Sequence, residues 1–329
     1  MSKMMWQPEE QQIQSSQMMV FMNFVNERFD ISLKNYMQLY EWSIDKAADF
    51  WGCFWEYSNI IHHTPFNKVV DNINRMPGAK WFEGAKLNFA QNLLHYRDEK
   101  AAIHYYDEEG NKISLTYAEL YDKVAGLAQS MRKIGIRKND RVAGFMPNIP
   151  ETIIAMLATS SIGAIWSSCS PDFGIKGVLD RFSQIEPKLI FIASGNQYNG
   201  KQIDCMEKFQ HILSNLPSVE KTVIVPYKIE SNIISINNSI LWNDFIESEL
   251  NNFYFEELPF DHPLYIMYSS GTTGLPKSIV HSSGGTLIQH LKELILHTDL
   301  TRDDNIFYFT TCGWMMWNWL VSSLNVGAT

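Results

Sequence analysis

The chain has 329 residues, of which 45% are hydrophobic, 13% aromatic and 19% charged. This composition excludes disorder over most of the length and is enough for one large or two ordinary globular cores. The formal net charge of -9 argues against a general nucleic-acid-binding surface, which would need clustered Lys and Arg. It leaves room for a local basic pocket that binds a phosphate group.

The four cysteines lie far apart, without the spacing of a zinc site or of a disulfide framework. We therefore expect reduced thiols in a cytoplasmic protein and no metal held by protein side chains. The N-terminus lacks the basic start and apolar run of a signal peptide. Residues 305–329 are uncharged and long enough for a membrane anchor, but several Asn, Ser and Thr residues interrupt them. We expect a buried strand and helix there, and no membrane contact.

Residues 1–94 are expected to be mainly helical. Ser43 is a candidate N-cap with Asp45 in the first turn of the helix that follows. Apolar residues then recur at helical spacing, at Ala47, Phe50, Trp51, Phe54 and Trp55. The simplest interpretation is an amphipathic helix that docks an aromatic face on the rest of the protein.

Strands and helices alternate after residue 100. Residues 101–106 and 112–115 are typical of a β-hairpin, and Thr116 to Glu119 form a capping box. The helix that it opens should end near Ile134, before Gly135. The same kind of pattern predicts strands at 141–146, 164–168, 188–193 and 222–225, and helices at 150–162 and 174–185. This order indicates an α/β fold with a parallel, doubly wound sheet.

The last part of the chain continues the alternation. An apolar strand at 264–268 leads directly into a loop rich in Gly, Ser and Thr. Further elements are expected as a helix at 286–297, a strand at 305–310 and a helix at 314–324.

The loop is the string Tyr268-Ser269-Ser270-Gly271-Thr272-Thr273-Gly274-Leu275-Pro276-Lys277. Its glycines let successive backbone N–H groups point at one anion, its hydroxyls add donors, and its lysine supplies a mobile positive charge. It is not a Walker A loop, because proline stands directly before the lysine. The composition therefore predicts a phosphate-binding loop of another kind.

The full loop string resembles the phosphate-binding signature of the adenylate-forming superfamily, which includes acyl-CoA synthetases, luciferases and peptide-synthetase adenylation domains. The segments at 76–82 and 87–94 resemble the N-terminal region of acetyl-CoA-synthetase-type enzymes. The resemblance covers essentially the whole chain. It implies a helical N-terminal cap at 1–94 and an incomplete adenylate-forming large domain at 95–329.

By this resemblance the loop binds the phosphates of ATP, with Mg²⁺ sharing their charge. The implied ATP contacts are Ser269, Ser270, Gly271, Thr272, Thr273, Gly274 and Lys277. Within this set, Lys277, Thr272 and Thr273 are the residues expected to stabilise the leaving pyrophosphate.

The second informative string is Thr311-Cys312-Gly313-Trp314-Met315-Met316-Trp317-Asn318-Trp319. It and Met5-Trp6-Gln7-Pro8 resemble the acetoacetate–CoA ligase branch of the superfamily. The resemblance implies an acyl pocket at Trp314, Met315, Met316 and Trp317, although Met and Trp on a helix are also typical of a core. It places Met316 near CoA, together with Gly200 and Lys201, for which a solvated loop is the alternative. His281 is interpreted as structural.

The implied activity is that of an acetoacetate–CoA ligase, which uses ATP and CoA and passes through an acyl-adenylate. The alternatives are a ligase for acetate, propionate or butyrate, a non-catalytic remnant, or one half of a split protein whose other half is a second chain. Members of the family are about twice as long, and their later motifs, including a catalytic lysine, would lie beyond residue 329. The chain alone is therefore expected to be inactive and to aggregate through residues 306–326.

Overall fold

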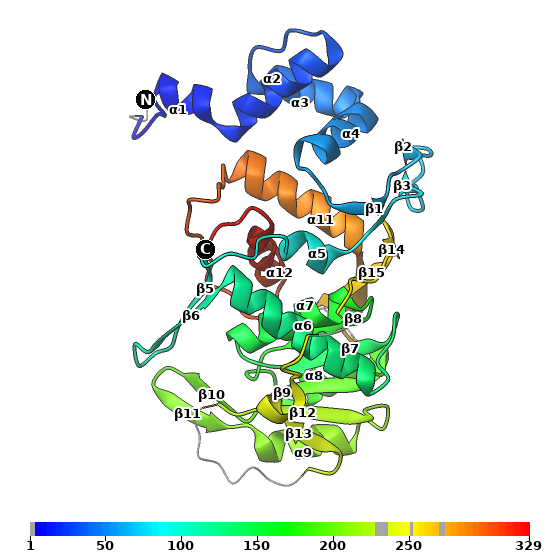
Figure 1. Cartoon of the computed structure of the whole chain (residues 1–329), viewed down its shortest axis with the longest axis vertical. Coiled ribbons are helices and arrows are strands. Elements are labelled where there is room, and N and C mark those ends of the chain that lie inside the picture. Colours follow the sequence, from blue (N-terminus) through cyan, green and yellow to red (C-terminus); the bar gives the residue numbers. More distant parts are fainter. Residues whose placement is uncertain (1–3, 228–235, 251–252, 270–273) are drawn as a thin grey trace.

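The computed structural model describes residues 4–227, 236–250, 253–269 and 274–329. The N-terminal helices form one end of the molecule, and the large sheet forms the other (Figure 1). Helices α5 (Phe89–Leu93), α11 (Ser283–Leu291) and α12 (Met315–Val321) lie between them. The N-terminus lies at the helical end, and the C-terminus lies in the middle of the molecule (Figure 1).

The N-terminal end consists of helices around an aromatic cluster. These are α1 (Glu10–Ser15), α2 (Gln17–Phe29), α3 (Tyr36–Asp45) and α4 (Ala47–Tyr57). The ring of Phe21 meets those of Phe50 and Phe54 edge-on, at centroid distances of 5.8 and 5.7 Å. The aromatic face predicted for α4 is therefore confirmed.

The predicted N-cap at Ser43 is wrong. Ser43 lies inside α3, where its Oγ donates to the carbonyl of Tyr40 at 2.7 Å, and α4 begins only after Lys46. A serine inside a helix can donate its hydroxyl to a carbonyl of the preceding turn, so a serine alone does not mark where a new helix begins.

Short strands follow the helices, so residues 1–94 are not mainly helical throughout. β1 (His62–Thr64) and β14 (Leu258–Pro259) both pair with β4 (Lys86–Leu87), and β2 (Lys68–Val70) pairs with β3 (Trp81–Glu83). Strands of two or three residues are too short to show an alternating pattern in the sequence. The first of these sheets joins the N-terminal segment to residues far along the chain.

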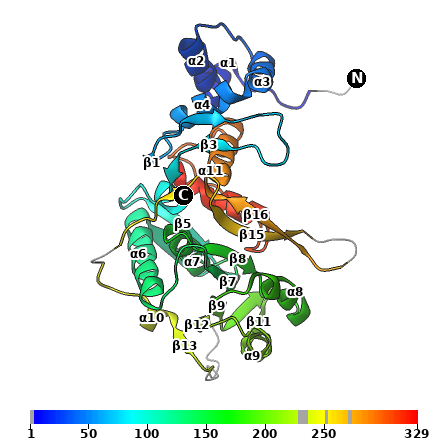
Figure 2. The same cartoon turned by 90° about the vertical axis from the view of Figure 1, so that its right-hand side faces the viewer.

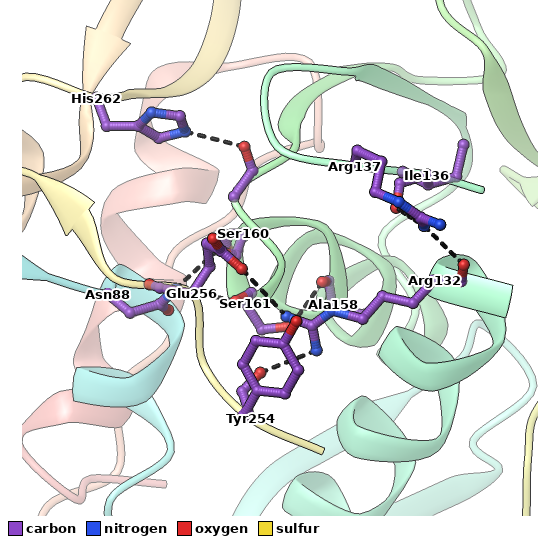
Figure 3. Close-up of polar contacts among 11 residues, drawn as sticks. Asn88, Arg132, Ile136, Arg137, Ala158, Ser160, Ser161, Tyr254, Glu256 and His262 are labelled. Atoms are coloured by element: carbon purple, nitrogen blue, oxygen red, sulfur yellow. Dashed lines mark hydrogen bonds and ion pairs between the residues drawn. The ribbon is translucent and has the colours of Figure 1, made fainter. Parts of the chain in front are cut away.

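Asn88 forms a buried polar link between the N-terminal segment and the large domain (Figure 3). Its side chain is fully buried and caps α5 (Phe89–Leu93), and its amide donates to the carbonyls of Ser160, Ser161 and Glu256 at 3.2, 3.0 and 3.0 Å. A buried amide with its partners satisfied is costly to replace. Within the segment 87–94 that was singled out in the sequence, Asn88 therefore has a structural role.

The large domain is built on a seven-stranded sheet of order β13-β12-β9-β7-β8-β15-β16. Its strands are β7 (Arg141–Phe145), β8 (Ile165–Cys169), β9 (Leu189–Ala193), β12 (Lys221–Val225), β13 (Ser239–Leu241), β15 (Pro263–Ser269) and β16 (Lys277–Ser282). All neighbours are parallel except β15 and β16, which are antiparallel. The predicted parallel sheet is confirmed, but its two outermost strands, β13 and β16, were not predicted.

Helices cover both faces of this sheet. Val142 of β7 packs into one core with α6 (Tyr117–Lys133) and α7 (Pro150–Ser161). Its neighbour Ala143 packs into a second core with α8 (Ile175–Ile185) and α9 (Met206–Ser214). Successive residues of a strand point to opposite faces, so the doubly wound arrangement follows.

Two hairpins and a short helix complete the domain. β5 (Ala101–Tyr106) pairs with β6 (Lys112–Thr116) as predicted, and the capping box of Thr116 and Glu119 opens α6. β10 (Gly195–Tyr198) and β11 (Lys201–Asp204) form a second hairpin that was not predicted. The short helix is α10 (Trp242–Phe245).

The C-terminal part contains α11 (Ser283–Leu291), which continues as a π-helical turn at Lys292–His297, and α12 (Met315–Val321), which ends in a 3₁₀ turn at Ser322–Asn325. The strand predicted at 305–310 is wrong, because these residues have no strand partner beside them within the described residues. Phe307 and Phe309 are exposed while Val321 and Leu324 are buried, so only part of the apolar segment faces solvent. Within the described ranges, no helix is long and apolar enough to cross a membrane.

Candidate functional site

The carboxyl ends of β7, β8 and β15 lie next to one another, and this row of strand ends is called the carboxyl edge of the sheet below. Val142 of β7 and Tyr265 of β15 both pair with Trp166 of β8, and all three strands run in the same direction. Ligands of open α/β sheets bind at this edge, where the loops that follow the strands converge. The two strings singled out in the sequence both reach it.

The phosphate loop connects β15 to β16. The two strands run side by side away from the helices that cover the sheet (Figure 2). Ser269 and Lys277 face each other across the antiparallel pair at the two ends of the loop, and both are exposed. Ser270, Gly271, Thr272 and Thr273 lie outside the described residues. Gly274 has a φ of 106°, a backbone conformation that favours glycine, and a Cβ added there would meet no atom within 4 Å.

Helix α8 holds the base of this loop. The Gln184 side chain donates to the carbonyl of Pro276 at 2.9 Å and accepts from the Ser278 hydroxyl at 3.2 Å. One turn earlier, the carbonyl of Arg181 accepts from the Tyr268 hydroxyl at 3.1 Å. These contacts fix the backbone on both sides of Lys277. These contacts could not be predicted from the sequence, because glutamine and arginine near a helix end belong to no motif.

The Cys312 segment is fastened to the same edge. The Ser168 hydroxyl donates to the carbonyl of Cys312 at 2.7 Å, and the Cys312 thiol donates to the carbonyl of Met146 at 2.9 Å. Burial raises the pKa of this thiol to about 12, so it remains a protonated donor at neutral pH. Cys53, Cys169 and Cys205 are likewise free and buried.

The candidate acyl-pocket residues separate into two groups. Trp314 and Met315 are 65% and 45% exposed at the edge, and Met316 is half-buried. Trp317 is only 1% exposed, and its indole donates to the Asn148 side chain at 2.8 Å. Trp317 therefore belongs to the core, and the acyl-pocket interpretation stays a prediction for Trp314, Met315 and Met316.

Asn318 connects the two strings. Its amide lies 3.6 Å from the sulfur of Met267, which stands two residues before Ser269 on β15. The N-terminal end of α12 and the start of the phosphate loop are therefore neighbours in space.

Gly200 and Lys201 lie elsewhere, at the turn of the β10–β11 hairpin, which Figure 1 shows apart from α12. The backbone amides of Asn199 and Gly200 donate to the two carboxylate oxygens of Glu108, at 2.8 and 2.6 Å. An incoming phosphate would have to displace that carboxylate.

His281 of β16 packs its ring on Tyr265 at a centroid distance of 5.0 Å. Burial lowers its pKa, which keeps the imidazole neutral. This arrangement agrees with a structural role.

The described residues contain no cluster of three or more His, Cys, Asp or Glu side chains suited to a metal ion. Mg²⁺ that accompanies a nucleotide relies largely on phosphate oxygens and water. We therefore assign no protein ligand to Mg²⁺ and derive no step through it.

A doubly wound sheet with a hydroxyl-rich phosphate loop at its carboxyl edge defines a class of nucleotide-dependent enzymes. The chain belongs to the AMP-binding enzyme family, whose model matches residues 89–329. A second model, described as the acetyl-coenzyme A synthetase N-terminus, matches residues 36–93. These matches confirm the resemblance inferred from the motifs.

Individual relatives are similar over nearly the whole chain. Acetoacetyl-CoA synthetases of Danio rerio and Rhizobium meliloti are 48% and 47% identical over 100% and 99% of this chain, and over 50% of their own length. A malonamoyl-CoA synthetase of Penicillium aethiopicum is 42% identical over 96% of this chain and 46% of its own. The structure of acetoacetyl-CoA synthetase from Streptomyces lividans matches with a TM-score of 0.93 and 40% identity, over 98% of this chain and 50% of that one. The chain spans about half the length of the curated relatives it matches.

Proposed function

We propose that this chain supplies the phosphate-binding and acyl-binding parts of an acetoacetate–CoA ligase. The observation that carries the proposal is the contact between Asn318 and Met267, which brings the phosphate loop and the Trp314–Met315 surface to one edge of the sheet. The names of the relatives at 45–48% identity support acetoacetate as the acid.

In the proposed reaction, a carboxylate oxygen of acetoacetate attacks the α-phosphorus of ATP. The bond from that phosphorus to the bridging oxygen breaks, and pyrophosphate leaves. Sulfur of CoA then attacks the acyl carbon, AMP leaves with the electron pair, and the thiol proton passes to solvent. Lys277 would neutralise charge on the departing pyrophosphate, with Ser269, Ser270, Gly271, Thr272, Thr273 and Gly274 supplying the remaining loop contacts.

We place the acid against Trp314 and Met315, because these two side chains are exposed at the start of the helix whose Asn318 contacts Met267. Met316 is proposed to lie closer to CoA. The proposal for Gly200 and Lys201 as CoA contacts has less support, since Glu108 already occupies the Gly200 amide. Trp317 would shape the pocket from behind through its bond to Asn148.

Three further expectations stand as proposals. The first is that the boundary between the N-terminal cap and the large domain lies near residue 94.

The second is that the protein is cytoplasmic, a location that would keep its four free thiols reduced. The relatives' second half contributes the remaining nucleotide contacts and the catalytic lysine, supplied either by continuation of the chain or by a partner.

The first experiment measures binding of pyrophosphate and of ATP to the 329-residue chain by calorimetry. We expect Lys277→Ala to weaken both by about tenfold or more, because a hydrogen bond to a charged group contributes about 1.5–3 kcal/mol. Lys201→Ala is the matched control and should leave both affinities unchanged. Equal affinities for the wild type and Lys277→Ala would remove Lys277 from the site.

The second experiment identifies the acid. Residues 1–329 are joined to the second half of the Rhizobium meliloti relative, and ATP–pyrophosphate exchange is measured with acetoacetate, malonamate, butyrate, propionate and acetate. We expect acetoacetate to give the highest kcat/KM. Malonamate is included because the Penicillium relative is named for malonamoyl-CoA, which has a carbonyl in the same position. Preference for an unsubstituted acid would establish another short-chain ligase, and no exchange with any acid would favour a non-catalytic remnant.

A further inference from the structure

The segment 307–314 leads into α12 and belongs to no helix or strand of the described structure. Repeating backbone hydrogen bonds therefore do not fix its place, which depends on individual contacts. The segment ends at Trp314, directly before Met315, and both of these side chains are exposed. Contacts that hold the last residues of the segment therefore decide where this exposed pair lies.

Ser168 holds the segment from β8. Its hydroxyl accepts from the indole N–H of Trp166 at 3.2 Å and donates to the carbonyl of Cys312 at 2.7 Å. Trp166 is fully buried, so its ring is fixed by the core. Because the Ser168 oxygen already accepts from the indole, its own proton is directed toward the Cys312 carbonyl.

The Cys312 thiol makes a second contact, to the end of β7. It donates to the carbonyl of Met146 at 2.9 Å, and the Met146 amide donates to the carbonyl of Cys169 at 3.1 Å. Cys312 is buried and is bonded through both its thiol and its carbonyl. A thiol is a weak donor, but a carbonyl that is buried beside it would lose its partner if the thiol were removed.

Gly313 shows how closely the segment lies on the loop after β8. A Cβ built on Gly313 would stand 3.4 Å from the Phe173 ring and 3.8 Å from the backbone nitrogen of Ser170. These are contact distances between packed groups. The residues directly before the exposed pair therefore lie against the ends of two strands and the loop that follows one of them.

We propose that Ser168 and the Cys312 thiol are positioning groups, which set the affinity for the acid by holding Trp314 and Met315 at the carboxyl edge. Neither group touches the acid, and each acts through the backbone that carries the exposed pair. On the far side of the pair, α12 is held by its buried Trp317. Loss of the two contacts would therefore free the approach to the pair and leave α12 in place. The inference rests on the proposed function, which assigns the acid to this pair.

The first test follows amide hydrogen exchange in the 329-residue chain, without nucleotide or acid. The Trp314 amide donates to the carbonyl of Thr311 at 3.1 Å, in a bond that spans Cys312. We expect this amide to exchange about threefold to tenfold faster in Cys312→Ala and in Ser168→Ala, because each variant loses one neutral hydrogen bond. Cys312→Ser keeps a donor and should exchange as the wild type does.

Two controls separate this effect from general destabilisation. Cys205→Ala removes another buried thiol, whose sulfur lies 3.8 Å from the Ile203 carbonyl, and it should leave exchange at Trp314 unchanged. The Ile165 amide donates to the carbonyl of Asp140 at the opposite end of β8 and reports opening of the sheet. Its exchange should be the same in every variant.

The second test measures ATP–pyrophosphate exchange with acetoacetate in the chain joined to the second half of the Rhizobium meliloti relative. We expect Cys312→Ala and Ser168→Ala each to raise KM for acetoacetate about threefold to tenfold, with kcat and KM for ATP unchanged. Cys312→Ser should restore the wild-type KM, and Cys205→Ala should not change it. A rise in KM for the acid alone is an effect that general destabilisation does not give.

Three results would overturn the proposal. The first is unchanged exchange of the Trp314 amide in both alanine variants, and the second is a Cys312→Ser variant that behaves as Cys312→Ala does. The third is an equal rise in KM for ATP and for acetoacetate. An inactive joined wild type would instead overturn the proposed function. Hydrogen exchange needs no substrate, so it would then still decide whether the two groups hold the segment.

Discussion

His290 is buried between α11 and the end of α12, and its Nδ1 lies 2.8 Å from the Ser322 hydroxyl. Burial lowers its pKa from about 6.5 to about 4; a proton on nearby His281 would lower the pKa further, whereas Glu293 raises it. The folded protein therefore holds this imidazole neutral at a pH where the unfolded chain has already bound a proton.

We expect the resulting stability to be complete above pH 6.5 and to fall as the pH drops toward 4, by at most about 3 kcal/mol. His290→Asn removes the titration and keeps a polar partner for Ser322. Urea unfolding between pH 4 and 7 should show a flatter profile for the variant. Parallel profiles for the two proteins would mean that His290 does not titrate as its burial implies.

At the residue scale, the motifs could nominate Ser269, Gly274 and Lys277 as phosphate contacts because the pattern that suggests them is local to one loop. Gln184 could not be found in this way, since its function depends on α8 lying beside Pro276 in the folded chain. The division of Trp314 from Trp317 is of the same kind. Both are aromatic residues at the start of one helix, and only packing decides which is exposed.

The start of α6 offers a test at the scale of the element. Thr116 accepts from the Glu119 amide at 3.1 Å while the Glu119 carboxylate accepts from the Thr116 amide at 2.8 Å. We expect Thr116→Ala to lower the free energy of unfolding by about 1 kcal/mol. Ser43→Ala, inside α3, should change it by less than about 0.5 kcal/mol. Thermal unfolding of both variants measures the difference, and similar losses would show that the reciprocal cap adds nothing.

The same contrast explains which elements were predictable. A reciprocal pair of residues fixed the start of α6, whereas a lone serine misplaced the start of α4. Five of the parallel strands were evident from their apolar runs, whereas β13 and β16, at the two ends of the strand order, were not; β16 has exposed residues such as Ile279 and Val280. An edge strand gains its pairing from its neighbour, and its own sequence carries little of that information.

At the scale of the whole molecule, contacts between the last residues and the segment 96–117 close the chain. Lys100 donates to the carbonyl of Gly327 at 2.6 Å, and Arg302 pairs with Asp98. Together with the bond from Tyr117 to Ala328, these contacts hold the C-terminal residues against the start of the large domain.

We expect Tyr117→Phe to destabilise the protein by about 1–2 kcal/mol, because the buried carbonyl of Ala328 would lose its donor. Tyr198→Phe, at an exposed tyrosine of β10, is the control and should have no measurable effect. Urea unfolding gives the free energies, and hydrogen exchange should show faster exchange of the Thr329 amide in Tyr117→Phe alone. Unchanged exchange there would contradict this account of the C-terminal contacts.

The bonds made by Asn88 bear on how the two family segments can be recombined. The model of the N-terminal segment ends at residue 93 and the AMP-binding model begins at residue 89, so Asn88 lies at the junction of the two. Its side-chain amide nevertheless donates to the carbonyls of Ser160, Ser161 and Glu256, which lie far along the chain (Figure 3). A chimera that exchanges the cap at residue 94 brings its own residue to this fully buried position, where three backbone carbonyls accept hydrogen bonds. Cap grafting is therefore limited by one side chain, because the grafted cap has to present an amide or another N–H donor at the position of Asn88.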